Sequence, residues 1–381
     1  MVGGLGVLGG LAAMQGLSWT LAGLAGSTGA RGGASAPMRD HGLLGAVLLL
    51  AGGLVLAWAL AGLSWPWRAG VLALLFVAFL AQFVLQLVFG LAGVVRRLCR
   101  ARRPDDHGGS PAIRRTAVLF GVAVDAVTRA RAVERIVDWA QRGRSGGPCR
   151  QVATMNVDFV LNAWGWNALA PRDAELLRAL RMADMVTADG MPVYWLADTL
   201  GGRLPERVAG SDLAADLAAA CAEQGLSLFL LCGTEPVLAA AAVRLTGAHP
   251  GLAIAGTLSP DLDLACARHE DACSINADIV AAVNASGADV LLVGCGNPKQ
   301  ELWIHENRHA LSCGVAVGVG GSFEFLAGVR RRAPAWMHVA GLEWLHRLYV
   351  EPGRLWRRYL TGMLRFNVLA LGALWRAAAM Q

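Results

Sequence analysis

Two long apolar runs stand out near the start of the chain. Residues 43–63 contain no charged side chain, and residues 71–95 form a second uncharged run of similar length. A helix that crosses a bilayer needs about 20 apolar residues. The turn between the runs carries Trp65 and Trp67, and tryptophan is enriched at membrane interfaces. We therefore predict an N-terminal transmembrane helical hairpin.

A cluster of arginines follows the second run and sets the expected orientation. It comprises Arg96, Arg97, Arg100, Arg102 and Arg103. Positively charged loops stay in the cytoplasm, so we expect an inner-membrane protein whose remaining chain faces the cytoplasm. Residues 1–30 are also uncharged, but they are glycine-rich and lack the basic start of a signal peptide. The role of residues 1–42, and whether there are two or three spans, stays open.

The pattern changes after the arginine cluster. Short apolar runs now alternate with segments of helical periodicity, which predicts a Rossmann-like parallel sheet flanked by helices. The strands are expected at 117–122, 151–155, 185–187, 226–232, 252–256, 288–293 and 314–319, and the helices at 129–142, 174–185, 213–225, 235–246 and 279–286.

The tail of the chain is predicted to be helical and is rich in arginine and tryptophan. At 100° per residue its arginines gather on one side and its large apolar residues on the other. The basic side holds Arg354, Arg357, Arg358 and Arg365, and the apolar side holds Trp356, Tyr359, Leu360 and Met363. A basic amphipathic helix is typical of a membrane-surface element. The alternative is a helix that packs on the domain and leaves its arginines in solvent.

These patterns divide the chain into four parts. We predict a membrane-anchoring region at 1–103, a polar linker at 104–112, an α/β core at 113–329 and a basic amphipathic C-terminal appendage at 330–381. The composition agrees with membrane attachment, because 55% of the 381 residues are hydrophobic and only 16% are charged.

The charge and the cysteine content exclude few classes of function. The net charge is +6, and Lys299 is the only lysine beside many arginines. Arginine-rich composition alone identifies no partner, and we predict no nucleic-acid binding. The eight cysteines show neither a C-x-x-C pair nor metal-type spacing. We expect them to be small buried residues in a reducing compartment.

The stretch from Gly294 to Trp303, GCGNPKQELW, carries the strongest chemical signal. It joins an expected buried strand to the start of a helix, the junction where open α/β sheets bind ligands. Pro298 suits the first turn of a helix because it has no N–H to satisfy there. The candidate substrate-binding residues here are Asn297, Lys299, Gln300 and Glu301.

Other polar residues follow the ends of other expected strands. Thr154, Asn156 and Asp189 belong to this group, and the carboxyl ends of parallel strands converge on one crevice. Asp189 is followed by Gly190, which allows close approach of a substrate, so we predict Asp189 as a general base. Asp212 directly precedes an expected helix, and we predict that it acts as an N-cap.

Two further motifs compete with this interpretation. His305 to His309 match H-E-x-x-H, a zinc-peptidase pattern in which Glu306 would be the base and Glu324 a third ligand. Asp261 and Asp263 resemble a metal-binding D-x-D, but no strand leads into them, and we expect a solvated turn. No G-x-G-x-x-G opens a βαβ unit with an acidic residue about 20 positions on, and the Walker A lysine is also absent from the sequence.

Several motifs in order resemble the WecG/TagA/CpsF glycosyltransferases. They are ADG at Asp189, LPERVAGSD at 204–212, GCGNPKQELWI at 294–304, GVGGSFEFLAG at 318–328, RAPAWM at 332–337, and GLEWLHRL followed by EPGRLWRRYL. The resemblance covers about Thr116 to Leu360. It implies inverting transfer of a hexose or N-acetylhexosamine-type sugar from a UDP-sugar to a polyprenyl-diphosphate-linked saccharide, without an obligatory metal or other cofactor, in surface or exopolysaccharide assembly.

The resemblance also implies roles for individual residues. Asp189 would be the base, Thr154, Asn156 and Gln300 would line the pocket, and arginines of the appendage would meet the lipid diphosphate at the membrane. Those arginines would be Arg347, Arg354, Arg357 or Arg358. This chain departs from the family's pattern at Val157-Asp158 and at Glu324. The donor sugar, the acceptor and the oligomeric state stay open, and a homo-oligomer is one possibility. Two alternative functions also stay open. They are a zinc metallopeptidase and a non-catalytic scaffold that binds lipid-linked sugar.

Overall fold

The fold is taken from a computed structural model of the chain. The chain divides into two compact units, residues 1–108 and 109–381. The predicted spans and the arginine cluster lie outside the described residues. No helix within the described part of the chain is both long and apolar enough to cross a membrane. The described residues are 116–143, 146–166, 170–202, 204–260, 270–334, 337 and 343–379.

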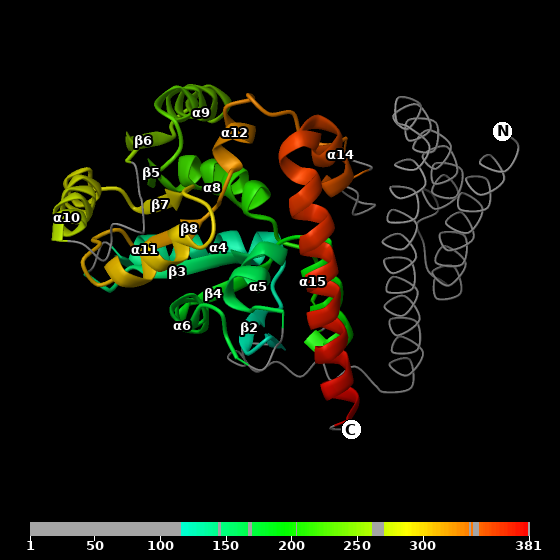
Figure 1. Cartoon of the computed structure of the whole chain (residues 1–381). Helices are drawn as coiled ribbons and strands as arrows, with labels where there is room; N and C mark the ends of the chain where they lie inside the picture. The colour runs from blue at the N-terminus through cyan, green and yellow to red at the C-terminus, as the bar shows by residue number, and fades with distance from the viewer. Residues whose placement is uncertain are drawn as a thin grey trace, which may run out of the picture. The chain divides into compact units, whose positions relative to one another are not determined.

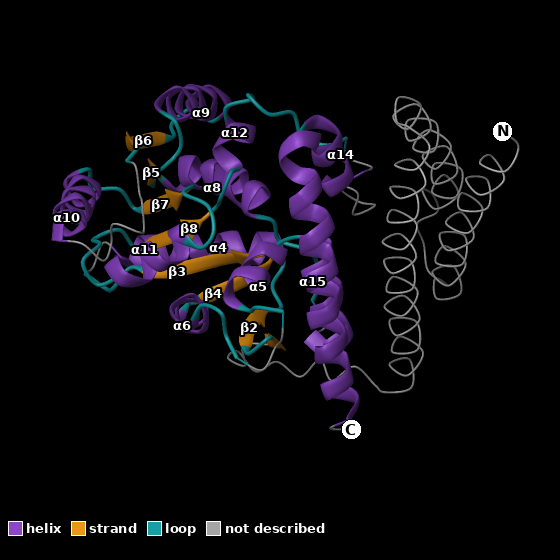
Figure 2. Ribbon diagram, viewed as in Figure 1, coloured by secondary structure: helices purple, strands orange, loops and turns teal. Residues whose placement is uncertain are grey.

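A six-stranded sheet forms the centre of the described unit (Figures 1 and 2). Its order is β4-β3-β8-β7-β5-β6, and every neighbouring pair is parallel. The predicted parallel α/β sheet is therefore confirmed. The strands are β3 (Arg150–Met155), β4 (Met185–Ala188), β5 (Ser227–Leu231), β6 (Ala253–Leu258), β7 (Val290–Val293) and β8 (Val315–Gly318).

Helices cover both faces of this sheet, as the alternation of its side chains requires. In β5, Leu228 and Leu230 join one hydrophobic cluster, and Phe229 and Leu231 join the other. Successive side chains of a strand point to opposite faces, so a strand buried on both sides is apolar throughout. The first face carries α4 (Arg129–Gly143), α8 (Gly210–Gln224) and α9 (Glu235–Ala248). The second face carries α10 (Glu270–Ala285) and α11 (Lys299–Asn307). Helix α6 (Ala174–Met182) packs against α11.

One predicted strand is in fact a hairpin. Residues 117–122 were expected to form a single strand, but β1 (Thr116–Leu119) and β2 (Val122–Asp125) pair antiparallel. The chain turns at Phe120 and Gly121, which both have positive φ. Two consecutive residues of this kind suit a tight hairpin turn, and glycine supplies one of them without steric cost. Asp125 then fixes the hairpin to the sheet, because its carboxylate accepts the Val186 N–H at 2.8 Å.

Several short helices were not predicted. They follow the strand ends, where turn residues interrupt any long hydrophobic period. They are α5 (Val157–Ala163), α7 (Met191–Ala197) with a π turn at Asp198–Gly202, and α12 (Ser322–Leu326).

The predicted helical tail is present as α14 (Glu343–Val350) and α15 (Pro352–Ala379). Helix α15 lies along α5 (Figure 1). Its buried side does not match the predicted apolar side, since Trp356 is exposed while Leu355, Phe366 and Leu369 are buried. In this rotation Leu355, Phe366 and Leu369 are buried, and Arg358 and Arg365 reach polar groups of α5.

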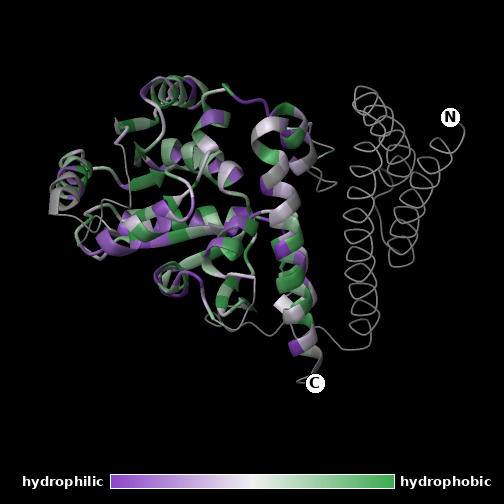
Figure 3. Cartoon of the chain, in the orientation of Figure 1, coloured by the Kyte–Doolittle hydropathy of each residue, from purple (hydrophilic) through white to green (hydrophobic). Residues whose placement is uncertain are grey.

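A second apolar row therefore faces outward from the C-terminal half of α15. Apolar and polar residues consequently alternate along the visible length of the helix in Figure 3. Its exposed members are Leu364, Val368, Leu371 and Trp375.

The cysteine prediction is partly wrong. Cys149, Cys221 and Cys313 are buried and free, as expected. Cys232 and Cys295, however, form a disulfide. They follow the ends of β5 and β7, which are paired neighbours in the sheet, and this brings their Cα atoms to 5.1 Å, within the range a disulfide needs.

Candidate functional site

Asp189 directly follows β4 at the carboxyl end of the sheet. Its N–H donates to the Met155 carbonyl oxygen at 2.8 Å, which continues the pairing of β3 with β4 by one residue. Gly190 then takes φ +87° and turns the chain into α7. A side chain at residue 190 would be strained in that conformation. The Asp189 side chain is left about 25% exposed.

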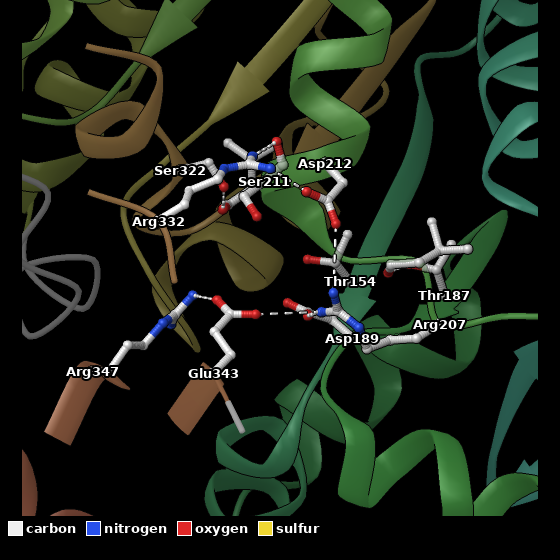
Figure 4. A network of polar contacts seen from close by, with 12 residues as sticks. Thr154, Thr187, Asp189, Arg207, Ser211, Asp212, Ser322, Arg332, Glu343 and Arg347 are labelled. Carbon is white, nitrogen blue, oxygen red and sulfur yellow. Dashed lines mark hydrogen bonds and ion pairs between the residues drawn. The ribbon is translucent and has the colours of Figure 1, made fainter. Parts of the chain in front are cut away.

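Arg207 lies among three carboxylates in this part of the structure (Figure 4). Its guanidinium nitrogens are 3.6 Å from Asp189, 3.5 Å from Asp212 and 3.8 Å from Glu343. Glu343 comes from α14 and also accepts a hydrogen bond from Arg347, one turn further along that helix. The core and the C-terminal helices therefore contribute to one charged network around Asp189.

The environment raises the pKa of Asp189 to about 6. Burial is the main cause, because it disfavours the charged form. The cations of Arg207 and Arg347 lower the pKa and so oppose this rise. The carboxylates of Glu343 and Asp212 raise it further. At pH 7 the carboxylate is mostly ionised yet has a higher proton affinity than an ordinary aspartate, the combination a general base needs.

Asp212 is not the N-cap that we predicted. Helix α8 begins earlier, at Gly210, with Ala209 as its N-cap residue. Gly210 packs closely on β3, where a Cβ would come within 2.9 Å of the Thr154 hydroxyl, so the first residue of α8 has room for glycine alone. Asp212 instead forms ion pairs with Arg207 and with Arg332.

Thr154 and Asn156 both make internal hydrogen bonds. Thr154 is only 3% exposed, and its hydroxyl donates to the Gly318 carbonyl oxygen at 2.9 Å, which ties β3 to β8. Asn156 caps α5, where its side chain accepts the Asp158 N–H at 3.0 Å. The Asn156 Cβ also lies beside Gly190, so Asn156 borders the turn that carries Asp189. A substrate contact for either residue stays a prediction.

The predicted residues of the GCGNPKQE loop form a second polar cluster. The Gln300 side-chain oxygen accepts the N–H groups of Gly296 at 3.2 Å and Gly320 at 3.0 Å, and thereby joins the loops after β7 and β8. Its amide nitrogen donates to the Glu301 carboxylate, as does Asn297 at 2.8 Å.

This cluster is closed to solvent at its centre. Gln300 and Glu301 are each about 1% exposed, and burial raises the pKa of Glu301 to about 7, against the opposing hydrogen bonds from Gln300 and Asn297. Asn297 in turn accepts a hydrogen bond from Asn162 of α5 at 2.6 Å. Lys299 is the first residue of α11 and is partly buried.

The predicted arginines of the appendage take different positions. Arg347 joins the network around Asp189. Arg358 instead forms an ion pair with Asp158, which links α15 to α5. The backbones of Arg354 and Arg357 belong to α15, but their side chains lie outside the described residues.

The zinc-peptidase alternative finds no support. His305 lies in α11, whereas His309 comes after the end of that helix. The predicted third ligand, Glu324, forms an ion pair with Arg330. No group of three His, Cys, Asp or Glu side chains able to hold a metal ion occurs in the described part of the chain. The residues Asp261 and Asp263 lie outside it.

The main site residue that the sequence did not single out is Arg207. Asp212 and Glu343 were likewise missed as partners of the base region. The sequence did offer a signal for Arg207 and Asp212. Both lie in the short segment 204–212, which also contains Gly210 and leads into a helix at the carboxyl end of the sheet. Ion pairing between segments so distant in sequence leaves no local pattern, so Glu343 carried no comparable signal.

Comparison with known proteins gives the family of the chain. The model of the "Glycosyl transferase WecG/TagA/CpsF family" matches residues 117–379. A relative from Bacillus subtilis, called "N-acetylglucosaminyldiphosphoundecaprenol N-acetyl-beta-D-mannosaminyltransferase", is 28% identical over 193 residues, which cover 50% of this chain and 70% of the relative. A protein of the same name from Bacillus spizizenii is 32% identical over 182 residues, which cover 48% of this chain and 66% of that protein. The chain therefore belongs to the WecG/TagA/CpsF family and is a glycosyltransferase.

Proposed function

We propose that the enzyme transfers a hexose or N-acetylhexosamine-type sugar from a UDP-sugar to a polyprenyl-diphosphate-linked saccharide. The name of the two relatives describes transfer of N-acetylmannosamine to such a diphospholipid, which supports this acceptor class and makes an N-acetylmannosamine donor the first to test. The single observation that carries the proposal is the partly exposed, desolvated carboxylate of Asp189 beside Arg207.

The proposed step is a single displacement with inversion. The acceptor hydroxyl oxygen forms a bond to the anomeric carbon, while the bond from that carbon to the UDP oxygen breaks. Asp189 takes the proton of the hydroxyl as attack proceeds, since a sugar hydroxyl is a weak nucleophile until it loses its proton. UDP leaves with the bonding electron pair, and nearby guanidinium groups stabilise its negative charge.

We also propose that the reaction needs no metal ion and takes place at the cytoplasmic face of the inner membrane. Arg207 and Arg347 supply positive charge beside the base, a role that a divalent cation fills in other transferases. The exposed apolar row of α15 supports contact with lipid, because large exposed apolar patches mark interaction surfaces. Activity should therefore persist in the presence of a chelator and should depend on detergent or vesicles.

The test is a donor screen in detergent with radiolabelled UDP-sugars and a prenyl-diphosphate N-acetylglucosamine acceptor. We expect transfer from one N-acetylhexosamine donor, with loss of transfer in an Asp189→Asn variant that is still folded. Failure of every UDP-sugar to label the lipid, or an unchanged rate in the variant, would reject the proposal.

A further inference from the structure

Two guanidinium groups lie against the ring of Phe325 in α12. The guanidinium carbon of Arg347 is 5.2 Å from the ring centroid, and that of Arg332 is 6.0 Å away. Distances of this size allow favourable cation–π contact. Arg347 comes from α14 and Arg332 from the segment between α12 and α14, so the aromatic ring brings cations from two separate segments to one place.

Both arginines are held by carboxylates and remain partly open to solvent. Arg332 pairs with Asp212 and donates to the Ser211 carbonyl oxygen at 2.7 Å, and Arg347 pairs with Glu343. The side chains of Arg332 and Arg347 are 38% and 43% exposed. A guanidinium carries five N–H donors in a fork, and the solvent-facing ones can still bind a ligand.

These carboxylates also connect the two arginines to the base. Asp212 and Glu343 each approach Arg207, the cation beside Asp189, at 3.5 and 3.8 Å. An anion bound between the exposed guanidinium groups would therefore lie next to the proposed reaction centre (Figure 4).

The charge of this region favours a multiply charged anion. Residues 330–366 contain eight arginines and two glutamates, and no aspartate or lysine. Arginine binds phosphate oxygens with paired, charge-assisted hydrogen bonds, which makes it well suited to phosphate recognition. A diphosphate presents several such oxygens and carries more charge than the carboxylates that now hold the arginines.

We propose that Arg332 binds the diphosphate group of a substrate together with Arg347, and that Asp212 and Glu343 hold the two guanidinium groups until the diphosphate displaces them. This inference rests on the proposed function, which supplies two sources of a diphosphate, the nucleotide and the lipid. It adds Arg332, which precedes α14, to the other arginines of the appendage.

The competing explanation is that Arg332 only stabilises the start of α8 through Asp212. The two explanations differ in the sign of one effect. If the pair is purely structural, removing either partner should have the same consequence. If Asp212 competes with a diphosphate for Arg332, Asp212→Asn should preserve or tighten diphosphate binding, whereas Arg332→Gln should weaken it.

The experiment measures binding of three probes to the full chain in detergent by calorimetry. Inorganic pyrophosphate reports the shared chemistry, while UDP and farnesyl diphosphate distinguish the nucleotide source from the lipid source. We expect Arg332→Gln to raise the Kd for pyrophosphate and for one of the other probes roughly tenfold or more. Arg332→Lys keeps the charge but loses the fork, and should give a smaller loss.

The matched control is Arg330→Gln. Arg330 lies in the same segment and pairs with Glu324 and Glu351 at 2.7 Å each, with a side chain that is 30% exposed, and neither of these carboxylates is among the three that lie around Arg207. Its variant should bind all three probes as the wild type does. Thermal unfolding of each variant verifies that the protein is folded.

The outcomes separate the inference from the proposed function. Wild-type affinity in Arg332→Gln and Arg332→Lys, or equal losses in Arg332→Gln and Asp212→Asn, would overturn the inference even if sugar transfer is intact. Absence of binding of all three probes by the wild type would overturn it as well. Selective loss in Arg332→Gln would support it even if the donor screen failed, in which case only the proposed function would be rejected.

Discussion

Two carboxylates at the carboxyl end of the sheet have raised pKa values, yet their surroundings differ. Glu301 is almost completely buried and accepts hydrogen bonds from two amide side chains that also join the loops around it. Asp189 is about a quarter exposed and lies near a guanidinium that it shares with two other carboxylates. Burial is the first cause of the raised pKa in both cases.

The comparison shows that a raised pKa does not by itself identify a base. A base must reach the proton that it removes, and only Asp189 combines proton affinity with access. The surroundings of Glu301 favour a different role, in which its carboxylate keeps the GCGNPKQE loop in one conformation. The following changes test this distinction, beginning with the largest expected effect.

Asp189→Asn should reduce sugar transfer by about 10²–10⁴-fold, the usual contribution of general-base catalysis. It should not reduce stability at neutral pH. The pKa of Asp189 is raised to about 6 in the folded state. The protonated side chain therefore contributes to the free energy of unfolding below the unfolded pKa near 4, and this contribution is lost as the pH rises through 6. Chemical denaturation at pH 7.5 should find the variant at least as stable as the wild type, and a large loss would contradict this account.

Glu301→Gln should have its main effect on stability. The new amide would direct N–H donors at the amides of Gln300 and Asn297, which now donate to the carboxylate. Leaving buried polar groups unsatisfied costs about 1–3 kcal/mol, and we expect a loss of that size in the free energy of unfolding.

The pH dependence of stability sharpens this test. The pKa of Glu301 rises to about 7 in the folded state, so the wild type should lose stability between about pH 4.5 and 7, and the Glu301→Gln variant should lack that part of the slope. Glu306→Gln is the matched control for the size of the stability loss, because Glu306 is exposed on the same helix. The pKa of Glu306 is also raised by partial burial, so the pH slopes of the two variants are each compared with that of the wild type. Equal free energies of unfolding for the two variants would show that Glu301 does not have the structural role proposed here.

Arg207→Gln and Glu343→Gln should move the acidic limb of the kcat/KM profile in opposite directions. Arg207 lowers the pKa of Asp189 and Glu343 raises it, so the limb should shift to higher pH in the first variant and to lower pH in the second. Rate measurements from pH 4.5 to 9 verify this. Shifts of the same sign would show that the network does not act on Asp189.

Arg358→Gln should have the smallest effect. The side chains of Arg358 and Asp158 are 52% and 32% exposed, and exposed ion pairs contribute at most about 1 kcal/mol. The free energy of unfolding should fall by that amount or less, as a double-mutant cycle with Asp158→Asn would measure. A loss of several kcal/mol would mean that this pair, rather than the apolar contacts of α15, holds the appendage.

Much of the fold could be predicted from local patterns. The apolar runs of β5, β7 and β8 and the helical periodicity of α4 and α9 gave the correct elements. The β1–β2 hairpin was missed because its turn depends on the backbone conformation of Phe120 and Gly121 and not on a polar break in the sequence.

The site could be predicted only in part. The position of Asp189 followed from the rule that strand ends converge, and the structure does place it beside residues of the C-terminal helices. The burial of Gln300 and the pairing of Asp212 could not be predicted, because both depend on contacts between loops far apart in the sequence. The same is true of the rotation of α15 against α5.

The most direct measurement is the pH dependence of kcat/KM for sugar transfer by the wild type, with Asp189→Asn and Glu301→Gln beside it. We predict a wild-type rate that rises with pH through a limb near pH 6, a flat and at least hundredfold lower profile for Asp189→Asn, and a limb retained in Glu301→Gln. A limb that persists in Asp189→Asn and disappears in Glu301→Gln would contradict the assignment of the base.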